Sequence, residues 1–238
     1  MTTTSDSFLL AHEPWVRLGC FAGVLAVMAA WEALAPRRPR ALPRHGRWPG
    51  NLGVVVVSSL ALRLLFPVAA VGLAAVAERQ GFGLLNLLGL PPWVSFLAAL
   101  LVLDLAIYAQ HVASHAVPIL WRLHRMHHAD LDIDATTGVR FHPVEIVLSM
   151  VFKLAVVALL GPPAVAVLVF EVGLNAAAMF NHANLRLPGG VDRALRLVLV
   201  TPDMHRVHHS IVRGERDSNF GFNLPWWDRL FGTYRAQP

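Results

Sequence analysis

Histidine is the residue whose spacing in this chain points most directly to chemistry. Ten of the twelve histidines lie between positions 111 and 209. Eight of these ten form three groups, which in chain order are His111-x-x-x-His115, His124-x-x-His127-His128 and His205-x-x-His208-His209. Residues three or four apart share one face of an α-helix, so each group directs several imidazoles into one small volume. His142 and His182 stand alone between the second and third groups.

Clustering distinguishes these histidines from ordinary core residues. A single buried histidine is more often a hydrogen-bonded core residue than a metal ligand, and each buried imidazole needs polar partners. Packing alone does not call for clustered imidazoles, whereas a divalent metal ion binds several converging neutral nitrogens. The three groups therefore predict a metal site. The isolated His142 and His182 are weaker candidates on spacing alone, and we leave His12 and His45 outside the site.

Polar residues at helical spacing extend two of these histidine positions. Asp104, Tyr108 and His111 are four and three residues apart and form one stripe, and an acid one turn from a ligand can accept the second N–H of its imidazole. An interfacial tyrosine beside a snorkelling aspartate is the alternative. Glu171 and Asn175 stand in a similar stripe before His182, which favours His182 as a ligand. We expect these four polar residues to orient ligands or carry protons.

Other familiar sites are absent from the sequence. His142 precedes Pro143, which can begin a helix and leave His142 as its cap or as a simple loop residue. Asp130, Asp132 and Asp134 alternate as in a calcium loop, but the glycine and glutamate of that loop are missing, so we interpret them as loop acids or as partners of ligands. No zincin signature, phosphate loop or activated nucleophile is present. Hydrolytic and phosphoryl-transfer chemistry are therefore not indicated.

The elements that must position these residues are membrane helices. The chain is 55% hydrophobic and 15% charged, with a mean hydropathy of +0.53, which is too apolar for an ordinary soluble domain. Two stretches, Trp15 to Leu34 and Leu52 to Val76, match the roughly 20 residues that span a bilayer. A shorter third stretch, Trp93 to Tyr108, is expected to continue as helix into the first histidine group.

Two further apolar stretches predict a helical hairpin. Ile146 to Leu160 and Val165 to Phe180 are separated by the helix-breaking sequence Gly161-Pro162-Pro163. The hairpin either spans the bilayer or is re-entrant, because its first stretch is short and contains Lys153. We thus expect an all-α integral membrane protein with about four to five membrane helices and a helical, histidine-rich cap.

Charge predicts the orientation of these helices. After the first stretch come five arginines, namely Arg37, Arg38, Arg40, Arg44 and Arg47. Because Asp6 and Glu13 precede that stretch, we interpret it as a retained span rather than a secretory leader. The positive-inside rule places the arginines in the cytoplasm, and counting crossings then places the histidine-rich cap on the same face. We divide the chain into an N-terminal helix with its Arg-rich loop (1–46) and a histidine-box domain (47–238).

The three histidine groups resemble the histidine boxes of the fatty acid hydroxylase and sterol desaturase superfamily of integral membrane oxygenases. Further segments between about Arg47 and Tyr234 are similar to that family, namely Asp104-x-x-x-Tyr108-x-x-His111, Phe141-His142-Pro143, Asn181-His182, Asn219-Phe220-Gly221 and Trp227-Asp228-Arg229-Leu230-Phe231-Gly232-Thr233-Tyr234. The resemblance implies two irons held by the box histidines, with His142 and His182 as further ligands. Imidazole suits iron, and purified protein can also carry zinc, which binds such nitrogens tightly.

The resemblance also implies a reaction. We expect O2-dependent hydroxylation or desaturation of a C–H bond in a fatty acyl chain, a sterol-like lipid or a carotenoid, in a bacterial inner membrane. Electrons would come from a separate ferredoxin or cytochrome with its reductase, since the chain has no motif for a fused cytochrome, an iron-sulfur cluster or a nucleotide fold.

Arg206, Arg213 and Arg216 would attract an acidic carrier or contact anionic headgroups, and we expect no nucleic-acid partner. A non-catalytic protein for zinc transport or sensing is the alternative, but the first two spans lack a path of ligands across the bilayer.

Overall fold

The computed structural model describes residues 4–236, and within that range the chain is helical, with a single isolated β-bridge and no named strand. The helices are α1 (Thr4–Ala11), α2 (Glu13–Leu34), α3 (Arg44–Leu65), α4 (Ala70–Gln80), α5 (Leu84–Leu88), α6 (Pro92–Ala116), α7 (Pro118–His128), η1 (Thr137–Val139), α8 (Pro143–Leu160), α9 (Ala164–His182), α10 (Gly189–Leu195), α11 (Pro202–His208), α12 (Arg213–Arg216) and α13 (Trp226–Leu230).

Five segments are long and apolar enough to cross a membrane, which confirms the predicted all-α membrane protein. They are Glu13–Leu34, Arg44–Leu88, Pro92–Ala116, Pro143–Leu160 and Ala164–His182. Both arms of the predicted hairpin are among them. Gly161 ends α8 in a left-handed conformation with φ of +61°, and Pro163 stands at the start of α9.

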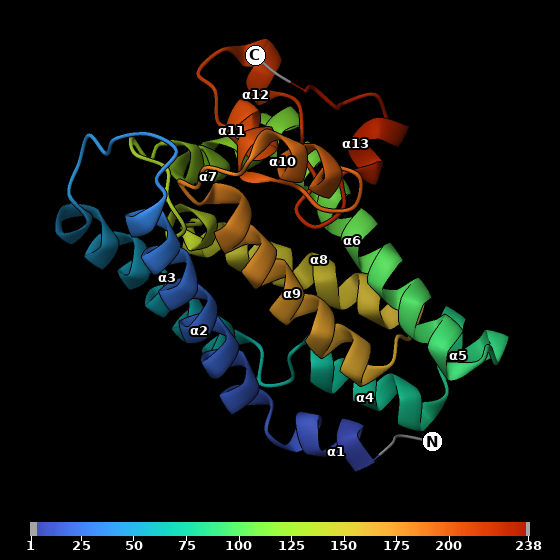
Figure 1. Cartoon of the computed structure of the whole chain (residues 1–238). Helices are drawn as coiled ribbons and strands as arrows, with labels where there is room; N and C mark the ends of the chain where they lie inside the picture. The colour runs from blue at the N-terminus through green and yellow to red at the C-terminus, as the bar shows by residue number, and fades with distance from the viewer. Residues whose placement is uncertain (1–3, 237–238) are drawn as a thin grey trace.

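The long helices place their histidine-bearing ends together. In Figure 1, α2, α6 and α9 run toward the end of the molecule that carries α7 and the small helices α10 to α13, whereas α3 and α8 run away from it. Helix α9 is central, because it packs against α2, α4 and α6. The Arg-rich connection between α2 and α3 lies at the same end as the histidines, as counting the crossings predicted.

The second apolar stretch departs from its prediction. We expected one helix over Leu52 to Val76, but α3 ends at Leu65 and α4 begins at Ala70. Pro67 lies in this break, where its lack of a backbone N–H and its ring oppose helix continuation. The break lets α4 turn and pack against α8 and α9 through its buried alanines.

The opposite end of the molecule is closed by a glycine contact. A Cβ atom added to Gly83 would lie 2.4 Å from the Cα of Gly161, so the loop before α5 meets the α8–α9 turn backbone to backbone. Asn86 donates a hydrogen bond from Nδ2 to the carbonyl of Gly161 at 3.1 Å. These contacts fix the far end of the hairpin whose near end carries the histidines.

Candidate metal centre

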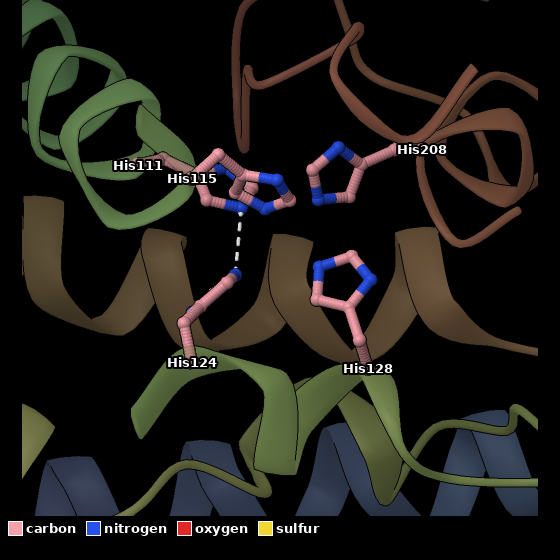
Figure 2. Close-up of side chains that lie close together, drawn as sticks. All are labelled: His111, His115, His124, His128 and His208. Carbon is pink, nitrogen blue, oxygen red and sulfur yellow. Dashed lines mark hydrogen bonds between the residues drawn. The ribbon is translucent and has the colours of Figure 1, made fainter. Parts of the chain in front are cut away.

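Nine of the ten candidate histidines form two groups, each with its ligand nitrogens within 4.8 Å of one another. The first group, drawn in Figure 2, consists of His111, His115, His124, His128 and His208. The second group consists of His127, His182, His205 and His209. Segments nearly 100 residues apart in sequence thus meet in two adjacent clusters of imidazoles.

Two of the three sequence groups are divided between the clusters. Helix α6 contributes two histidines one turn apart to the first group, and α9 contributes His182 to the second. Helix α7 directs His127 into the second group and the rest of its box into the first. Helix α11 directs His208 into the first group, whereas the rest of its box enters the second. Neighbouring positions on a helix differ by about 100° in direction, so one short helix can serve two sites.

The Nε2 atoms of the second group converge as ligands do around a cation. The Nε2 atom of His182 lies 3.0 Å from Nε2 of His127, 3.0 Å from Nε2 of His205 and 2.9 Å from Nε2 of His209. A single imidazole nitrogen cannot form three such hydrogen bonds, because it either donates one proton or offers one lone pair. A metal ion in contact with all four rings would satisfy them, and the donor set fits one.

The first group fits a cation by a second observation. His115, His128 and His208 each have a buried Nε2 atom without a hydrogen-bond partner. Buried nitrogens of this kind are costly unless something binds them. The Nε2 atoms of His111 and His124 also face each other at 3.2 Å, as the dashed line in Figure 2 marks. Five nitrogens therefore converge on one small volume.

Backbone carbonyls fix the tautomers of four of these rings. The Nδ1 atoms donate to carbonyl oxygens in the pairs His111 to Phe220 at 2.7 Å, His127 to Arg140 at 3.3 Å, His182 to Ala178 at 2.6 Å and His208 to Ser218 at 2.8 Å. Since a carbonyl oxygen can only accept, the proton lies on Nδ1 and the lone pair lies on Nε2, the atom that faces the cluster.

Two carboxylates that the sequence analysis did not identify play the same part. Glu145 Oε1 lies 2.6 Å from Nδ1 of His124, and Asp217 Oδ1 lies 3.4 Å from Nδ1 of His115. Glu145 stands in the first turn of α8. An acidic residue beginning an apolar helix was the available signal for it, whereas nothing in the sequence connected Asp217 with His115.

Asp104 does not contact His111 as we expected, because the carbonyl of Phe220 takes that position. Its carboxylate instead accepts hydrogen bonds from Asn223 Nδ2 at 2.7 Å and Trp227 Nε1 at 2.8 Å. It therefore anchors the C-terminal segment that carries Phe220, and it acts on His111 through that segment.

Tyr108 also binds the C-terminal segment. Its hydroxyl lies 2.9 Å from Thr233 Oγ1, and its ring stacks on Phe231 with centroids 5.5 Å apart. The fully buried Asp228, to which the sequence analysis gave no individual role, accepts the backbone N–H groups of Phe220 and Gly221, each at 2.8 Å. Asp104 and Tyr108, which we expected to act on the ligands, thus bind the C-terminal segment whose residue Phe220 contacts His111.

Glu171 and Asn175 lie away from both histidine groups. Glu171 pairs with Lys153 and Arg17, each at 2.5 Å, and stands eleven positions before His182 on α9. At 1.5 Å per residue that is about 16 Å along the helix. Asn175 donates to the backbone carbonyl of Glu171 at 3.0 Å. Glu171, Asn175 and His182 do lie on one helix, α9, but the two polar residues lie within the helical bundle, away from the metal site.

His142 belongs to neither group. Its Nδ1 atom accepts a hydrogen bond from the Val144 N–H at 3.2 Å, so it caps the start of α8. This agrees with the capping position predicted from Pro143, and no ligand contact accompanies it in the part of the chain that the structure describes.

Three histidines of α7 and α11, which lie outside the membrane-spanning segments, have lowered pKa values. Burial first, and then the neighbouring imidazoles, keep the pKa of His128, His205 and His208 well below its usual range. A neutral ring offers the lone pair that a metal ion needs, so a low pKa favours metal binding by these three rings.

Two surface cavities reach this centre. One is bordered by His209 together with Arg37, Arg38 and Arg206. The other is bordered by both His128 and His209, with Arg122 and Arg125 at its rim. At least one histidine of each group therefore lines a hollow in the surface of the protein.

The family model for fatty acid hydroxylase matches residues 96–233, which include all ten candidate histidines. With more than half of its length matched, the chain belongs to the fatty acid hydroxylase family. The two-cluster site described above lies entirely within this match. The comparisons do not favour the alternative of zinc transport or sensing.

Three relatives illustrate the range of the family. An ornithine lipid hydroxylase of Rhizobium tropici is 25% identical over 235 residues, 95% of this chain and 69% of that protein. Human alkylglycerol monooxygenase is 32% identical over 158 residues, 66% of this chain but only 34% of the relative's length. Rat cholesterol 25-hydroxylase is 27% identical over 222 residues, 90% of this chain and 71% of the relative. No solved structure matches.

Proposed function

We propose that this protein is a membrane-bound di-iron oxygenase that hydroxylates a membrane lipid. The carrying observation is the pair of adjacent all-imidazole clusters, each with enough converging nitrogens for one ion. Bound iron would supply the change of oxidation state that C–H oxidation with O2 requires and that zinc lacks.

The reaction balances with an external donor. In hydroxylation, one oxygen atom of O2 enters a C–H bond and the other leaves as water, with two electrons and two protons supplied from outside. Desaturation would instead remove two hydrogens from adjacent carbons and release both oxygen atoms as water. We favour hydroxylation, because the three relatives described above are named hydroxylases or monooxygenases.

The side chains have distinct parts in this proposal. Nine histidines hold the ions, and backbone carbonyls with Glu145 and Asp217 fix the tautomers of six of the nine rings. Asp104 and Tyr108 hold the C-terminal segment over the site. For Glu171 and Asn175, and for His142 as a ligand, the geometry supports structural roles rather than the catalytic or ligating roles expected from sequence.

The substrate class follows from the membrane setting. The ornithine lipid, alkylglycerol and cholesterol in the relatives' names share a large apolar part and a polar end. We propose a lipid of this kind as the substrate, and we favour an acyl-chain lipid over a sterol-like lipid or a carotenoid. The centre would lie at the cytoplasmic face of a bacterial inner membrane, because the Arg-rich loop lies at the histidine end. A ferredoxin or cytochrome with its reductase would supply electrons.

Replacement of one histidine from each cluster tests the proposal. We expect two irons per chain in the purified protein, one iron in His208→Ala and one in His127→Ala, with loss of lipid oxidation in both variants. The measurements are iron content and incorporation of 18O from 18O2 into membrane lipids of expressing cells. The exposed His45→Ala is the matched control and should behave as the unmodified protein. Zinc binding without any oxidised lipid would instead support a non-catalytic metal protein.

A further inference from the structure

A carboxylate from outside the family-matched segment reaches the backbone beside the second histidine group. Glu32 lies near the end of α2 and is fully buried, with 0% of its surface exposed. Its Oε1 atom accepts two backbone N–H groups, from Ala135 at 2.8 Å and from Asn184 at 2.9 Å. One oxygen atom thus joins two segments that are about 50 residues apart in sequence.

The other oxygen of Glu32 is neutralised by Arg40 of the loop between α2 and α3 and by Arg44, the first residue of α3. Arg44 Nη2 donates to Oε2 at 2.8 Å and to the carbonyl of Ala29 at 2.9 Å, while Arg40 Nη2 lies 3.8 Å from Oε2. A buried carboxylate without such partners would be strongly destabilising. Because Oε2 is paired with Arg44 and Arg40, Oε1 is left to the two amides.

Both amides are connected to His182, Asn184 along the chain and Ala135 through Gly138 and Ala178. Asn184 is two residues beyond it, and the Asn184 carbonyl also accepts the Arg37 N–H at 3.0 Å. Ala135 belongs to the loop after α7, in which Gly138 packs on Ala178 so closely that a Cβ would lie 2.2 Å from the Ala178 oxygen. That same oxygen accepts the Nδ1–H of His182 at 2.6 Å.

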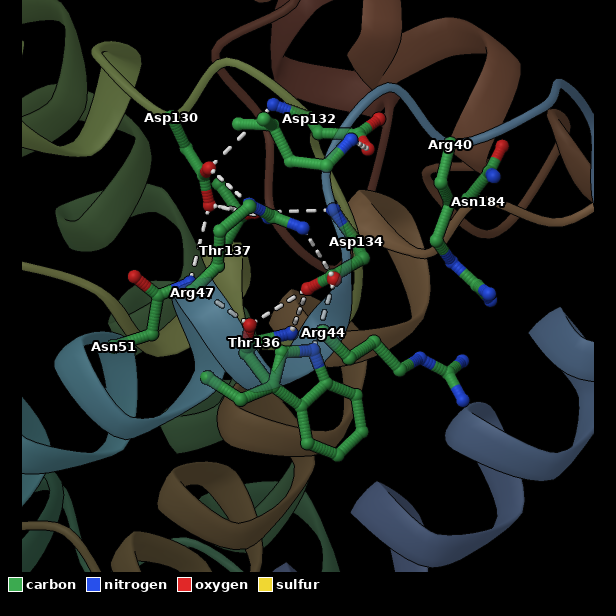
Figure 3. Close-up of polar contacts among 12 residues, drawn as sticks. Arg40, Arg44, Arg47, Asn51, Asp130, Asp132, Asp134, Thr136, Thr137 and Asn184 are labelled. Carbon is green, nitrogen blue, oxygen red and sulfur yellow. Dashed lines mark hydrogen bonds and ion pairs between the residues drawn. The ribbon is translucent and has the colours of Figure 1, made fainter.

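A second set of polar contacts holds the same loop from α3. Figure 3 shows Arg47 between Asp130 and Asp134, with Nη2 2.8 Å from Asp130 Oδ2 and Nη1 2.9 Å from Asp134 Oδ2. Asn51 Nδ2 donates to Thr136 Oγ1 at 2.9 Å. Asp130 and Asp134 therefore position the loop, and none of the three loop acids of the sequence analysis belongs to a histidine group.

We propose that Glu32 is a positioning residue for the second metal ion. It binds the segment that follows His182 and the loop that packs against α9 beside it. In the first group, by contrast, four of the five Nδ1 atoms face carbonyls or carboxylates of other residues, namely Phe220, Ser218, Glu145 and Asp217. Removing the carboxylate should therefore release the ion of the second group and leave that of the first.

Iron stoichiometry tests this inference, which rests on the proposed pair of ions. Purified protein in detergent is loaded with Fe2+ without oxygen, desalted, and analysed for iron per chain. We expect two irons in the unmodified protein, one in Glu32→Ala and two in Glu32→Gln, because the amide oxygen still accepts both N–H groups. Glu78→Gln is the control, since Glu78 accepts the Ala164 N–H at 2.8 Å at the opposite end of α9.

The outcomes separate this inference from the proposed function. Fewer than two irons in the unmodified protein contradicts the di-iron proposal itself. Two irons in Glu32→Ala, or none, overturns the positioning role. The double variant Glu32→Ala with His208→Ala should bind no iron, and one remaining iron would show that Glu32 serves the first group. Should Glu32→Ala fail to fold, Glu32→Asp keeps the charge but shortens the reach, and it must lose one iron that Glu32→Gln keeps.

Discussion

At the residue scale, the ability of each imidazole to bind a metal ion depends on the partner of its Nδ1 atom, the nitrogen that points away from the cluster. A carbonyl leaves no ambiguity, whereas a carboxylate adds negative charge and makes the ring a stronger ligand. His124, with Glu145 at 2.6 Å, is therefore the ring of the first group most dependent on a side-chain partner. Glu145 is buried, so its loss would leave a buried N–H without an acceptor.

Glu145→Ala should weaken binding of the first ion by roughly 10- to 100-fold, the usual effect of removing such a partner. The measurement is competition between the loaded protein and a chelator of known affinity. Glu145→Gln is the matched control, because its amide oxygen can accept the same hydrogen bond, and it should lose much less. Equal affinities in the Ala variant and the unmodified protein would contradict the role given to Glu145.

At the scale of elements, the site depends on how closely the loop before α8 approaches α9. Gly138 in η1 has its Cα against the backbone of Ala178, and α9 presents His182 one turn later. Only the absence of a side chain permits this contact. The approach also brings Ala135 within reach of Glu32, so one glycine allows the loop, α2 and α9 to meet.

Gly138→Ala should push η1 away from α9 and destabilise the protein by about 1–3 kcal/mol, the usual cost of overpacking. Thermal unfolding in detergent should show a lower Tm, together with lower iron content. The control is Gly173→Ala on α9, where an added Cβ meets nothing within 4 Å and helix propensity improves. Similar Tm values for the two variants would refute this account of the loop.

At the scale of the whole molecule, the histidine end presents a basic surface around the second cavity. The arginines singled out from the sequence are paired here, Arg206 with Asp203, and Arg213 and Arg216 with Asp217. Arg122 and Arg125 on α7 are exposed, and neither forms an ion pair within the described residues. They line the same cavity as His128 and, unlike Arg216 of that cavity, their charges are not paired, so they are better placed to attract an acidic electron carrier.

Charge reversal tests this surface. The double variant Arg122→Glu with Arg125→Glu should lower turnover driven by an acidic [2Fe–2S] ferredoxin at least tenfold at low ionic strength, yet leave turnover with dithionite and the iron content unchanged. Arg193→Glu, an exposed arginine on α10, is the control. An equal loss with both reductants would mean that these arginines serve the site or the lipid rather than the carrier.

Local pattern was enough to determine the membrane helices and the metal-binding character of the chain. Histidines at helical spacing, apolar runs near bilayer length and the Gly161-Pro162-Pro163 turn are all features of neighbouring residues, and their effects do not depend on distant parts of the fold. The directions of the helices relative to one another followed from counting successive crossings, and the arginines after the first span predict which end faces the cytoplasm. The break between α3 and α4 was also signalled locally, by Pro67, although apolarity alone concealed it.

Only the tertiary structure decided how the histidines are divided between two clusters and what holds them. The division of His127 from His128 depends on where α9 and α11 pack around α7. Asp217 and Glu32 contact the site region from about 100 or more residues away, and Asp104 proved to bind the C-terminal segment instead of a ligand. Such contacts arise from packing between distant segments, so residue spacing carries no record of them.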